Sequence, residues 1–163
     1  MDNIKILEEV KTILRDESLD FVIQLNMICE LLKTKKSNYD WVGFYFADVS
    51  QQTLHLGPYA GQPTDHKVIP FGKGICGQVA ERHETFLVDD VNAQDNYIAC
   101  SIHVKSEIVV PLFINNINVG QIDIDSNTKN AFSEDDEELL RQINQAISQH
   151  IASQKIDLKT LRV

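Results

Sequence analysis

The chain has 163 residues, 43% of them hydrophobic and 24% charged, which is typical of one globular domain. No apolar run approaches the roughly 20 residues that a membrane-spanning helix needs. The net charge of -9 disfavours nucleic acid and membrane surfaces as partners, because both are anionic.

Residues 1–36 predict a pair of helices, because apolar residues recur at helical spacing over 6–14 and again over 21–32. Alternating residues then predict a strand over 41–48 and a second, short strand over 53–56. Two prolines and two glycines within 57–65 indicate a loop.

The middle of the chain predicts short elements. We expect an extended piece at 68–69, a helix over 75–82 entered through the Gly72-Lys73-Gly74 turn, and a strand over 85–88. Residues 89–105 are polar and show no periodicity. A loop of that length in a compact domain is often functional.

Two apolar strands, 107–114 and 118–124, are joined by a hairpin signal at 115–117. Ser133 is expected to cap a last helix that ends near 155, with Asp136 as its capping-box partner. Strands mostly follow strands, so the order predicts an α+β domain. Its sheet should be largely antiparallel, with the helices segregated to one side.

The first ten residues are acidic and amphipathic, which is unlike a signal peptide and favours a cytoplasmic location. In that reducing compartment, Cys29, Cys76 and Cys100 are not expected to form a structural disulfide. Cys29 lies on an apolar helical stripe and is interpreted as an inert core residue.

Residues 72–77 match the G-x-G-x-x-G pattern, but the elements around them do not alternate strand and helix, so we reject a dinucleotide site. The glycines instead predict a tight turn and a helix start. Cys76 would then lie in the first helical turn, where the helix dipole lowers the pKa of a thiol.

Cys100 lies in the long polar loop near His103 and Lys105, which favours a thiolate. The sequence equally allows that Cys100 is an ordinary loop cysteine without a reactive thiolate. Cys76, His83, Cys100 and His103 do not have the spacing of paired zinc ligands, so no metal site is expected.

Glu107, Asp123 and Asp125 lie on or at the ends of apolar strands, and the two aspartates share a face because they are two residues apart. That face can be the solvent side of an antiparallel sheet. If it is covered instead, the carboxylates would raise one another's pKa and could bind an ammonium group or donate a proton.

Six segments then resemble one family. They are DWVGFY (40–45), LGPY (56–59), IPFGKGICG (69–77), YIAC (97–100), SEIVVP (106–111) and IDIDS (122–126). In this order they are similar to the free methionine-(R)-sulfoxide reductases, stand-alone GAF domains with a central antiparallel sheet flanked by helices. The resemblance implies one GAF domain over 1–163, with a helical pair (1–36), a sheet with active-site loops (39–126) and a C-terminal helix (133–155).

The resemblance also implies an activity: thiol-dependent reduction of free L-methionine-(R)-sulfoxide to L-methionine, with no cofactor and with thioredoxin as the reductant. Cys100 would be the nucleophile that becomes a sulfenic acid, and Cys76 would resolve it as an intramolecular disulfide. The substrate pocket implied by the resemblance is lined by Trp41, Tyr45, Glu107, Asp123 and Asp125. A second copy of the chain is a further candidate partner.

One departure concerns a further cysteine that many members carry just upstream of the Gly-rich turn. Here His66 stands near that position, so a relay through a third thiol is not expected. Two alternatives remain open. One is a non-catalytic GAF sensor of a small molecule, and the other is a redox switch in which Cys76 and Cys100 form a regulatory disulfide.

Overall fold

The computed structural model describes residues 2–98 and 101–163. Its helices are α1 (Asn3–Arg15), α2 (Phe21–Lys35), α3 (Gly74–Arg82) and α4 (Glu134–Gln154), with short 3-10 turns η1 (Val91–Ala93) and η2 (Leu158–Leu161). Its strands are β1 (Trp41–Asp48), β2 (Thr53–Ala60), β3 (Val68–Pro70), β4 (Phe86–Val88), β5 (Ser106–Ile114) and β6 (Ile117–Ser126). No helix of the described residues is both long enough and apolar enough to cross a membrane.

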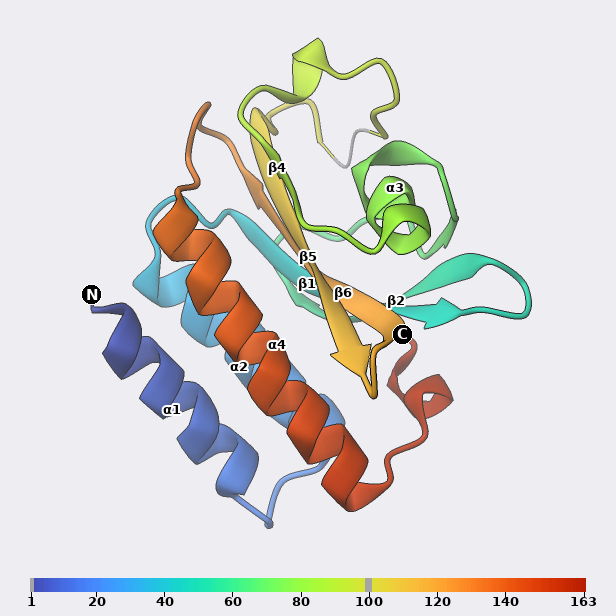
Figure 1. Ribbon diagram of the computed structural model, residues 1–163. Helices are drawn as coiled ribbons and strands as arrows, with labels where there is room; N and C mark the ends of the chain where they lie inside the picture. The colour runs from blue at the N-terminus through green and yellow to red at the C-terminus, as the bar shows by residue number, and fades with distance from the viewer. Residues whose placement is uncertain (1, 99–100) are drawn as a thin grey trace.

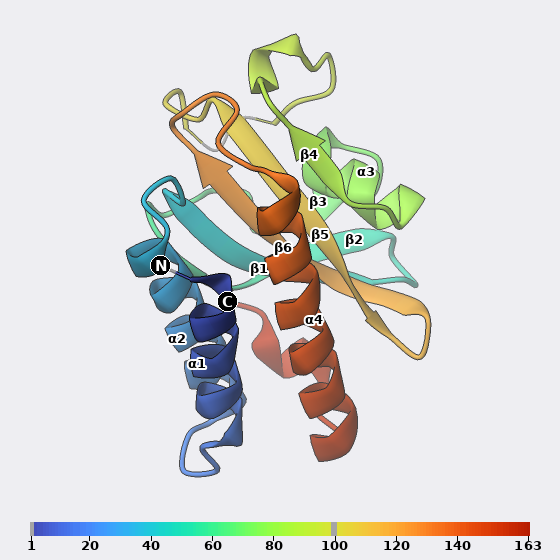
Figure 2. The ribbon, with the colours of Figure 1, turned by 60° about the vertical axis from the view of Figure 1, so that its left-hand side comes forward.

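The strands form one antiparallel sheet in the order β3-β2-β1-β6-β5-β4, which confirms the predicted α+β class (Figure 1). The expected segregation of helices to one side is wrong in one respect. α1, α2 and α4 cover one face, whereas α3 lies on the other (Figures 1 and 2).

Both faces of the sheet are therefore covered, and each has its own hydrophobic core. Along β1, Val42, Phe44 and Phe46 pack against the helices α1, α2 and α4, while Trp41 and Tyr45 belong to the core under α3. The alternation of β1 was predicted, but the burial of its second face was not. The pattern is also that of a strand with one face in solvent, and only α3 and the loops around it exclude water from this face.

The loop expected over 57–65 begins later than predicted, because β2 continues through Gly57 and Pro58 to Ala60. Proline cannot donate a ladder hydrogen bond. The pairing with β1 accommodates it through an irregularity, since Tyr45 pairs with Leu56 whereas Gly43 already pairs with residue 59. A bulge thus lets a strand pass a residue that usually ends one.

The predicted β5–β6 hairpin is confirmed, with a tighter turn than expected. Asn115 and Asn116 have φ angles of 51° and 65°, and Ile117 already belongs to β6. Two successive left-handed residues form the turn that matches the twist of antiparallel strands, and asparagine tolerates that conformation. This turn fixes which residues of β5 face those of β6.

The start of α4 is tied to the segment between α2 and β1 by a network around Asp136. The predicted capping box with Ser133 is present, and the Tyr39 hydroxyl donates a hydrogen bond of 2.5 Å to Asp136 Oδ1. Lys36 Nζ lies 3.4 Å from the same oxygen. Burial alone would raise the pKa of Asp136, but the hydrogen bonds from Tyr39 and Ser133 and the charge of Lys36 lower it.

We predict that Asp136→Ala lowers the free energy of unfolding by about 2–3 kcal/mol, because it removes a helix cap and leaves the Tyr39 hydroxyl unpaired. Urea denaturation measures the change. Asp135→Ala, an exposed neighbour in the same helical turn, is the matched control and should change stability by less than about 0.5 kcal/mol.

The pH dependence of that difference provides the check. A carboxyl whose folded pKa is lowered contributes stability above its unfolded pKa of about 3.9 and loses it as pH falls through the folded value. The difference in free energy of unfolding between the wild type and Asp136→Ala should therefore become smaller in acid. An equal gap at neutral pH and well below pH 4 would contradict the role of the ionised carboxylate.

Candidate active site

Three adjacent strands bring acidic side chains together on the face covered by α3. Asp125 of β6 is paired with Trp41 on one side and with Glu107 on the other, and Asp123 lies two residues further along the same strand, on the same face. All three carboxyl groups are buried, with exposed fractions of 1% for Asp123 and Asp125 and 4% for Glu107. This face of the sheet is therefore covered and is not the solvent side, which decides between the two interpretations of the sequence.

The Gly-rich turn places Cys76 over these carboxylates, as expected from a turn and a helix start. Gly74, with a φ of 65°, precedes Cys76 at the beginning of α3. Gly77 must lack a side chain, since a Cβ there would lie 2.7 Å from the carbonyl oxygen of Pro70. This close approach of helix and strand points Cys76 into the space between α3 and the sheet.

Asn96 is a site residue that sequence reasoning missed. Its Oδ1 accepts a 2.9 Å hydrogen bond from the Gly74 amide, and its Nδ2 donates one of 2.7 Å to the Gly72 carbonyl. These bonds tie the 89–105 loop to the turn that carries Cys76. A lone loop asparagine gives no sequence signal of a partner more than twenty residues away.

Cys76, Glu107 and Asp123 form a compact cluster. The Cys76 thiol donates a hydrogen bond to Glu107 Oε2 over 3.8 Å, and one donor atom from each residue lies within 4.8 Å of the other two. Burial, followed by the charges of Asp123, Glu107 and Asp125, raises the pKa of Cys76 well above its usual value.

The expectation that the helix dipole lowers the pKa of Cys76 is therefore wrong. A dipole contributes about 0.3–1 kcal/mol at an exposed site, whereas desolvation and adjacent carboxylates can shift a pKa by several units. The sequence placed Cys76 correctly in the first turn of α3 but gave no indication of what lies beneath that turn.

Burial also raises the pKa of Asp123, an effect reduced by its hydrogen bonds with Glu107 and Cys76 and by the charge of His66. Two buried carboxyl groups in contact cannot both ionise without a large electrostatic cost. A carboxyl pair whose ionisation is disfavoured in this way is a potential acid for a bound substrate.

The two predicted wall aromatics hold the neighbouring loop. Trp41 Nε1 donates a 3.0 Å hydrogen bond to the Gln62 carbonyl, and the Tyr45 hydroxyl donates one of 2.9 Å to the His66 carbonyl. The two rings lie 6.4 Å apart between centroids, and Trp41 stacks on Tyr59 at 5.4 Å. These contacts fix the 61–67 segment over the carboxylates.

Two cavities divide the predicted site residues between them. A small one of about 10 Å³ is lined by Tyr45, His66, Ile69, Lys73, Gly74, Ile75, Cys76, Ile98, Glu107 and Asp123. A larger one of about 520 Å³ is lined by Asp40, Trp41, Gln62, Pro63, Thr64, Ser101, His103, Val104, Asp125 and Asn127. Cys100 lies outside the described residues, but Ser101 and His103, which follow it in the chain, line the larger cavity.

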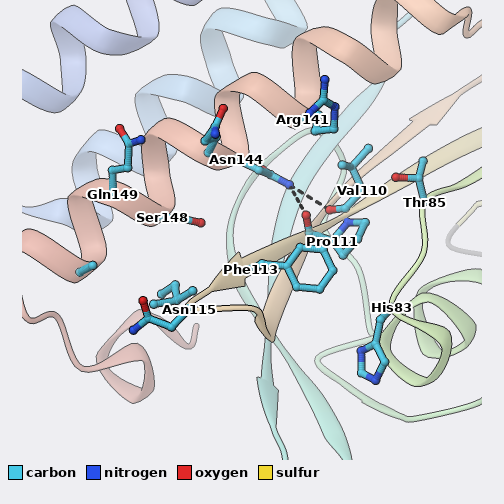
Figure 3. A pocket seen from close by; sticks show the side chains of 13 residues that line it. His83, Thr85, Val110, Pro111, Phe113, Asn115, Arg141, Asn144, Ser148 and Gln149 are labelled. Carbon is cyan, nitrogen blue, oxygen red and sulfur yellow. Dashed lines mark hydrogen bonds between the residues drawn. The ribbon is translucent and has the colours of Figure 1, made fainter.

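A further cavity of about 510 Å³ lies between α4 and β5, and His83 and Thr85 also line it (Figure 3). Asn144 there donates to the Val110 and Pro111 carbonyls at 3.0 and 3.1 Å. Among the described residues that line it, only His83 and Arg141 are ionisable, and Arg141 pairs with Glu138. None of the described residues that line this cavity carries a thiol or a carboxyl group, so we do not assign the chemistry to it.

Cys29 is a core residue, as predicted. It lies fully buried on α2 with its thiol 3.6 Å from the Pro58 carbonyl, and burial raises its pKa strongly. Because it belongs to the core under α1, α2 and α4, the sheet separates it from Cys76. His83 caps the far end of α3, so Cys76 and His83 do not form a metal site.

Comparison with known proteins gives one consistent family. A family model described as "GAF domain" matches residues 23–152. The free methionine-R-sulfoxide reductases of Escherichia coli and Saccharomyces cerevisiae are each 37% identical to the chain, covering 76% and 77% of it and 73% and 76% of their own length.

A solved structure agrees with these relatives. The X-ray structure of free methionine-R-sulfoxide reductase from Neisseria meningitidis in complex with its substrate superposes with a TM-score of 0.87 at 33% identity. The match covers 94% of this chain and 92% of that protein.

Gly43 provides a test of the aromatic wall. A Cβ at this position would lie 2.3 Å from the Trp41 ring and 2.8 Å from Tyr59 Cβ, so Gly43→Ala must displace the indole. We predict a loss of about 1–3 kcal/mol in stability. The fluorescence emission of Trp41, the only tryptophan of the chain, should shift to longer wavelength.

A double-mutant cycle with Trp41→Leu is the control, since removing the indole should recover more than about 1 kcal/mol of the cost of Gly43→Ala. Unchanged emission together with additive costs would show that the ring does not occupy the space above Gly43.

Proposed function

Because the chain belongs to the free methionine-R-sulfoxide reductases of the GAF-domain family, we propose that it reduces free methionine-(R)-sulfoxide to methionine. The observation that carries the proposal is the buried cluster of Cys76, Glu107 and Asp123 beside the aromatic wall of Trp41 and Tyr45. Thiol, acid and apolar surface are the groups that this reaction requires.

Recognition of the free amino acid follows from charge. Asp125 lines the larger cavity next to Trp41, and the adjacent carboxyl groups give this region strong negative potential. The substrate's ammonium group would offset the cost of burying these carboxylates. Its S-methyl group would contact the indole, which offers apolar surface without a competing charge.

The first chemical step transfers oxygen to sulfur. The Cys100 thiolate attacks the sulfoxide sulfur, and the oxygen then transfers to the cysteine sulfur. A new S–O bond forms on Cys100 while the substrate's S–O bond and the transient S–S bond break, so that methionine leaves and Cys100 becomes a sulfenic acid. Two electrons pass from the cysteine to the substrate, and one proton is needed at the oxygen. The raised pKa of Asp123 supports this carboxyl as the proton donor.

The second step forms a disulfide. The Cys76 sulfur attacks the sulfenic sulfur of Cys100, and the hydroxyl group leaves as water with the thiol proton. The raised pKa of Cys76 means that a base must assist, and Glu107, which accepts the hydrogen bond from this thiol, is suitably placed. A dithiol protein such as thioredoxin would then reduce the Cys76–Cys100 disulfide.

We predict that the cysteine variants separate these steps. Cys100→Ser should form no methionine even in a single turnover, whereas Cys76→Ser should release about one equivalent and stop as a sulfenic acid that a dimedone-type reagent traps. Cys29→Ser is the matched control for a buried thiol and should keep full turnover. A burst in Cys100→Ser but not in Cys76→Ser would reverse the two roles.

The same experiment separates the alternative functions. The enzyme loses two thiols for each methionine formed, and peptide mapping should find Cys76 joined to Cys100 with Cys29 free. A sensor binds methionine sulfoxide without losing thiols. A redox switch forms the disulfide with an oxidant such as peroxide but yields no methionine from the sulfoxide.

We also predict that N-acetylmethionine sulfoxide is a poor substrate. Acylation removes the ammonium charge and leaves a buried carboxylate unpaired, which should lower kcat/KM roughly 100-fold. Steady-state rates with the free (R)-epimer, the (S)-epimer and the acetylated form measure the effect. Equal rates for free and acetylated substrates would exclude recognition through the ammonium group.

A further inference from the structure

The cluster of Cys76, Glu107 and Asp123 brings together one sulfur and two carboxylate donors from three different elements, α3, β5 and β6. We propose that in the reduced protein these three side chains bind one thiophilic divalent cation, with Zn²⁺ as the representative ion, and that the bound ion inhibits the enzyme. The site itself stands independently of the activity, whereas the inhibition rests on the proposed function.

The donor set and its spacing suit such an ion. Zinc accepts thiolate and carboxylate ligands in tetrahedral geometry with bonds of about 2.0–2.3 Å, so its ligand atoms lie about 3.5 Å apart. Cys76 Sγ and Glu107 Oε2 are 3.8 Å apart, and all three donors lie within 4.8 Å of one another. Three protein ligands would leave the fourth position for water.

A second observation points to a small cationic ligand. Asp123 is 1% exposed, yet its Oδ1 has no hydrogen-bond partner among the described residues. An unsatisfied buried carboxylate oxygen is costly and calls for a donor or a cation. Asp123 lines the cavity of about 10 Å³, which has room for about one water-sized particle.

Charge balance favours the same conclusion. Glu107 and Asp123 adjoin Asp125 on the sheet, so the cluster lies in a region of concentrated negative charge. Binding replaces the proton of the Cys76 thiol and the proton carried by the Asp123–Glu107 pair with the metal, and both protons pass to solvent. No electrons are transferred, and the sulfur stays fully reduced.

The inhibition would follow from shared residues. An ion on Glu107 and Asp123 neutralises the charge that attracts the substrate's ammonium group, and it holds Cys76 so that the sulfur cannot attack a sulfenic acid. Conversely, a disulfide between Cys76 and Cys100 removes the thiolate ligand. The reduced form would therefore bind the ion and the oxidised form would not.

The binding test uses the full chain reduced with a phosphine rather than a chelating dithiol. Titration of Zn²⁺ against a chromogenic chelator should give one equivalent, and Cd²⁺ should show a thiolate charge-transfer band. Cys76→Ser should abolish the band, and Asp123→Asn and Glu107→Gln should each weaken zinc binding about 100-fold. Mg²⁺, which prefers six oxygen ligands, should not compete.

Two cysteine controls locate the sulfur ligand. Both Cys29→Ser and Cys100→Ser should still bind one equivalent of zinc. Cys29→Ser removes a thiol that is also buried but lies on the other face of the sheet. Zinc binding that survives Cys76→Ser, or that is lost in Cys100→Ser, would overturn the site. Circular dichroism of each variant shows whether a lost equivalent reflects lost ligands or a lost fold.

The inhibition is measured separately. In an enzyme freed of metal by a chelator, added Zn²⁺ should raise the KM for free methionine sulfoxide and lower kcat, and chelator should restore both. Zinc bound at one equivalent with unchanged KM and kcat would refute the inhibition. If metal-free enzyme never forms methionine, the proposed function fails while the titration still decides the site.

Discussion

The pairing register of β6 holds Asp123 and Asp125 in a covered space, and the arrangement of the site depends on it. A slip of one residue would turn both aspartates toward α4 and bring Ile122 and Ile124 under α3. Those two isoleucines are fully buried in the core under α1, α2 and α4, which makes such a slip prohibitively costly. Apolar burial on one face therefore stabilises the charged groups on the other.

The different composition of the two faces also explains why the surroundings of Cys29 and Cys76 differ. Cys29, a residue of α2, belongs to the core between the helices and the sheet, where its thiol contacts the Pro58 carbonyl. Cys76 lies on the face of the proposed active site, where burial and the neighbouring carboxyl groups together raise its pKa. Two buried cysteines therefore differ in their proposed roles because different groups surround each sulfur.

Features set by neighbouring residues were predictable from the sequence, and features set by distant contacts were not. The limits of β1, the hairpin at Asn115 and Asn116 and the Ser133 cap follow from alternation, turn chemistry and local hydrogen bonding. The placement of α3 across the sheet does not, because its short apolar stripe fits either face. Hence the carboxylates were identified, but the high pKa of Cys76 and the anchoring by Asn96 required the structure.

The edges of the sheet have a consequence for self-association. β3 and β4 are only three residues long, and β3 ends in Pro70, so neither outer strand presents a continuous template for another chain. β5 extends past its last pairing with β4 at Val109. There Pro111 lacks an amide hydrogen, and Asn144 occupies the carbonyls of Val110 and Pro111. The short strands β3 and β4 and the blocked end of β5 thus disfavour edge-to-edge pairing along these parts of the sheet.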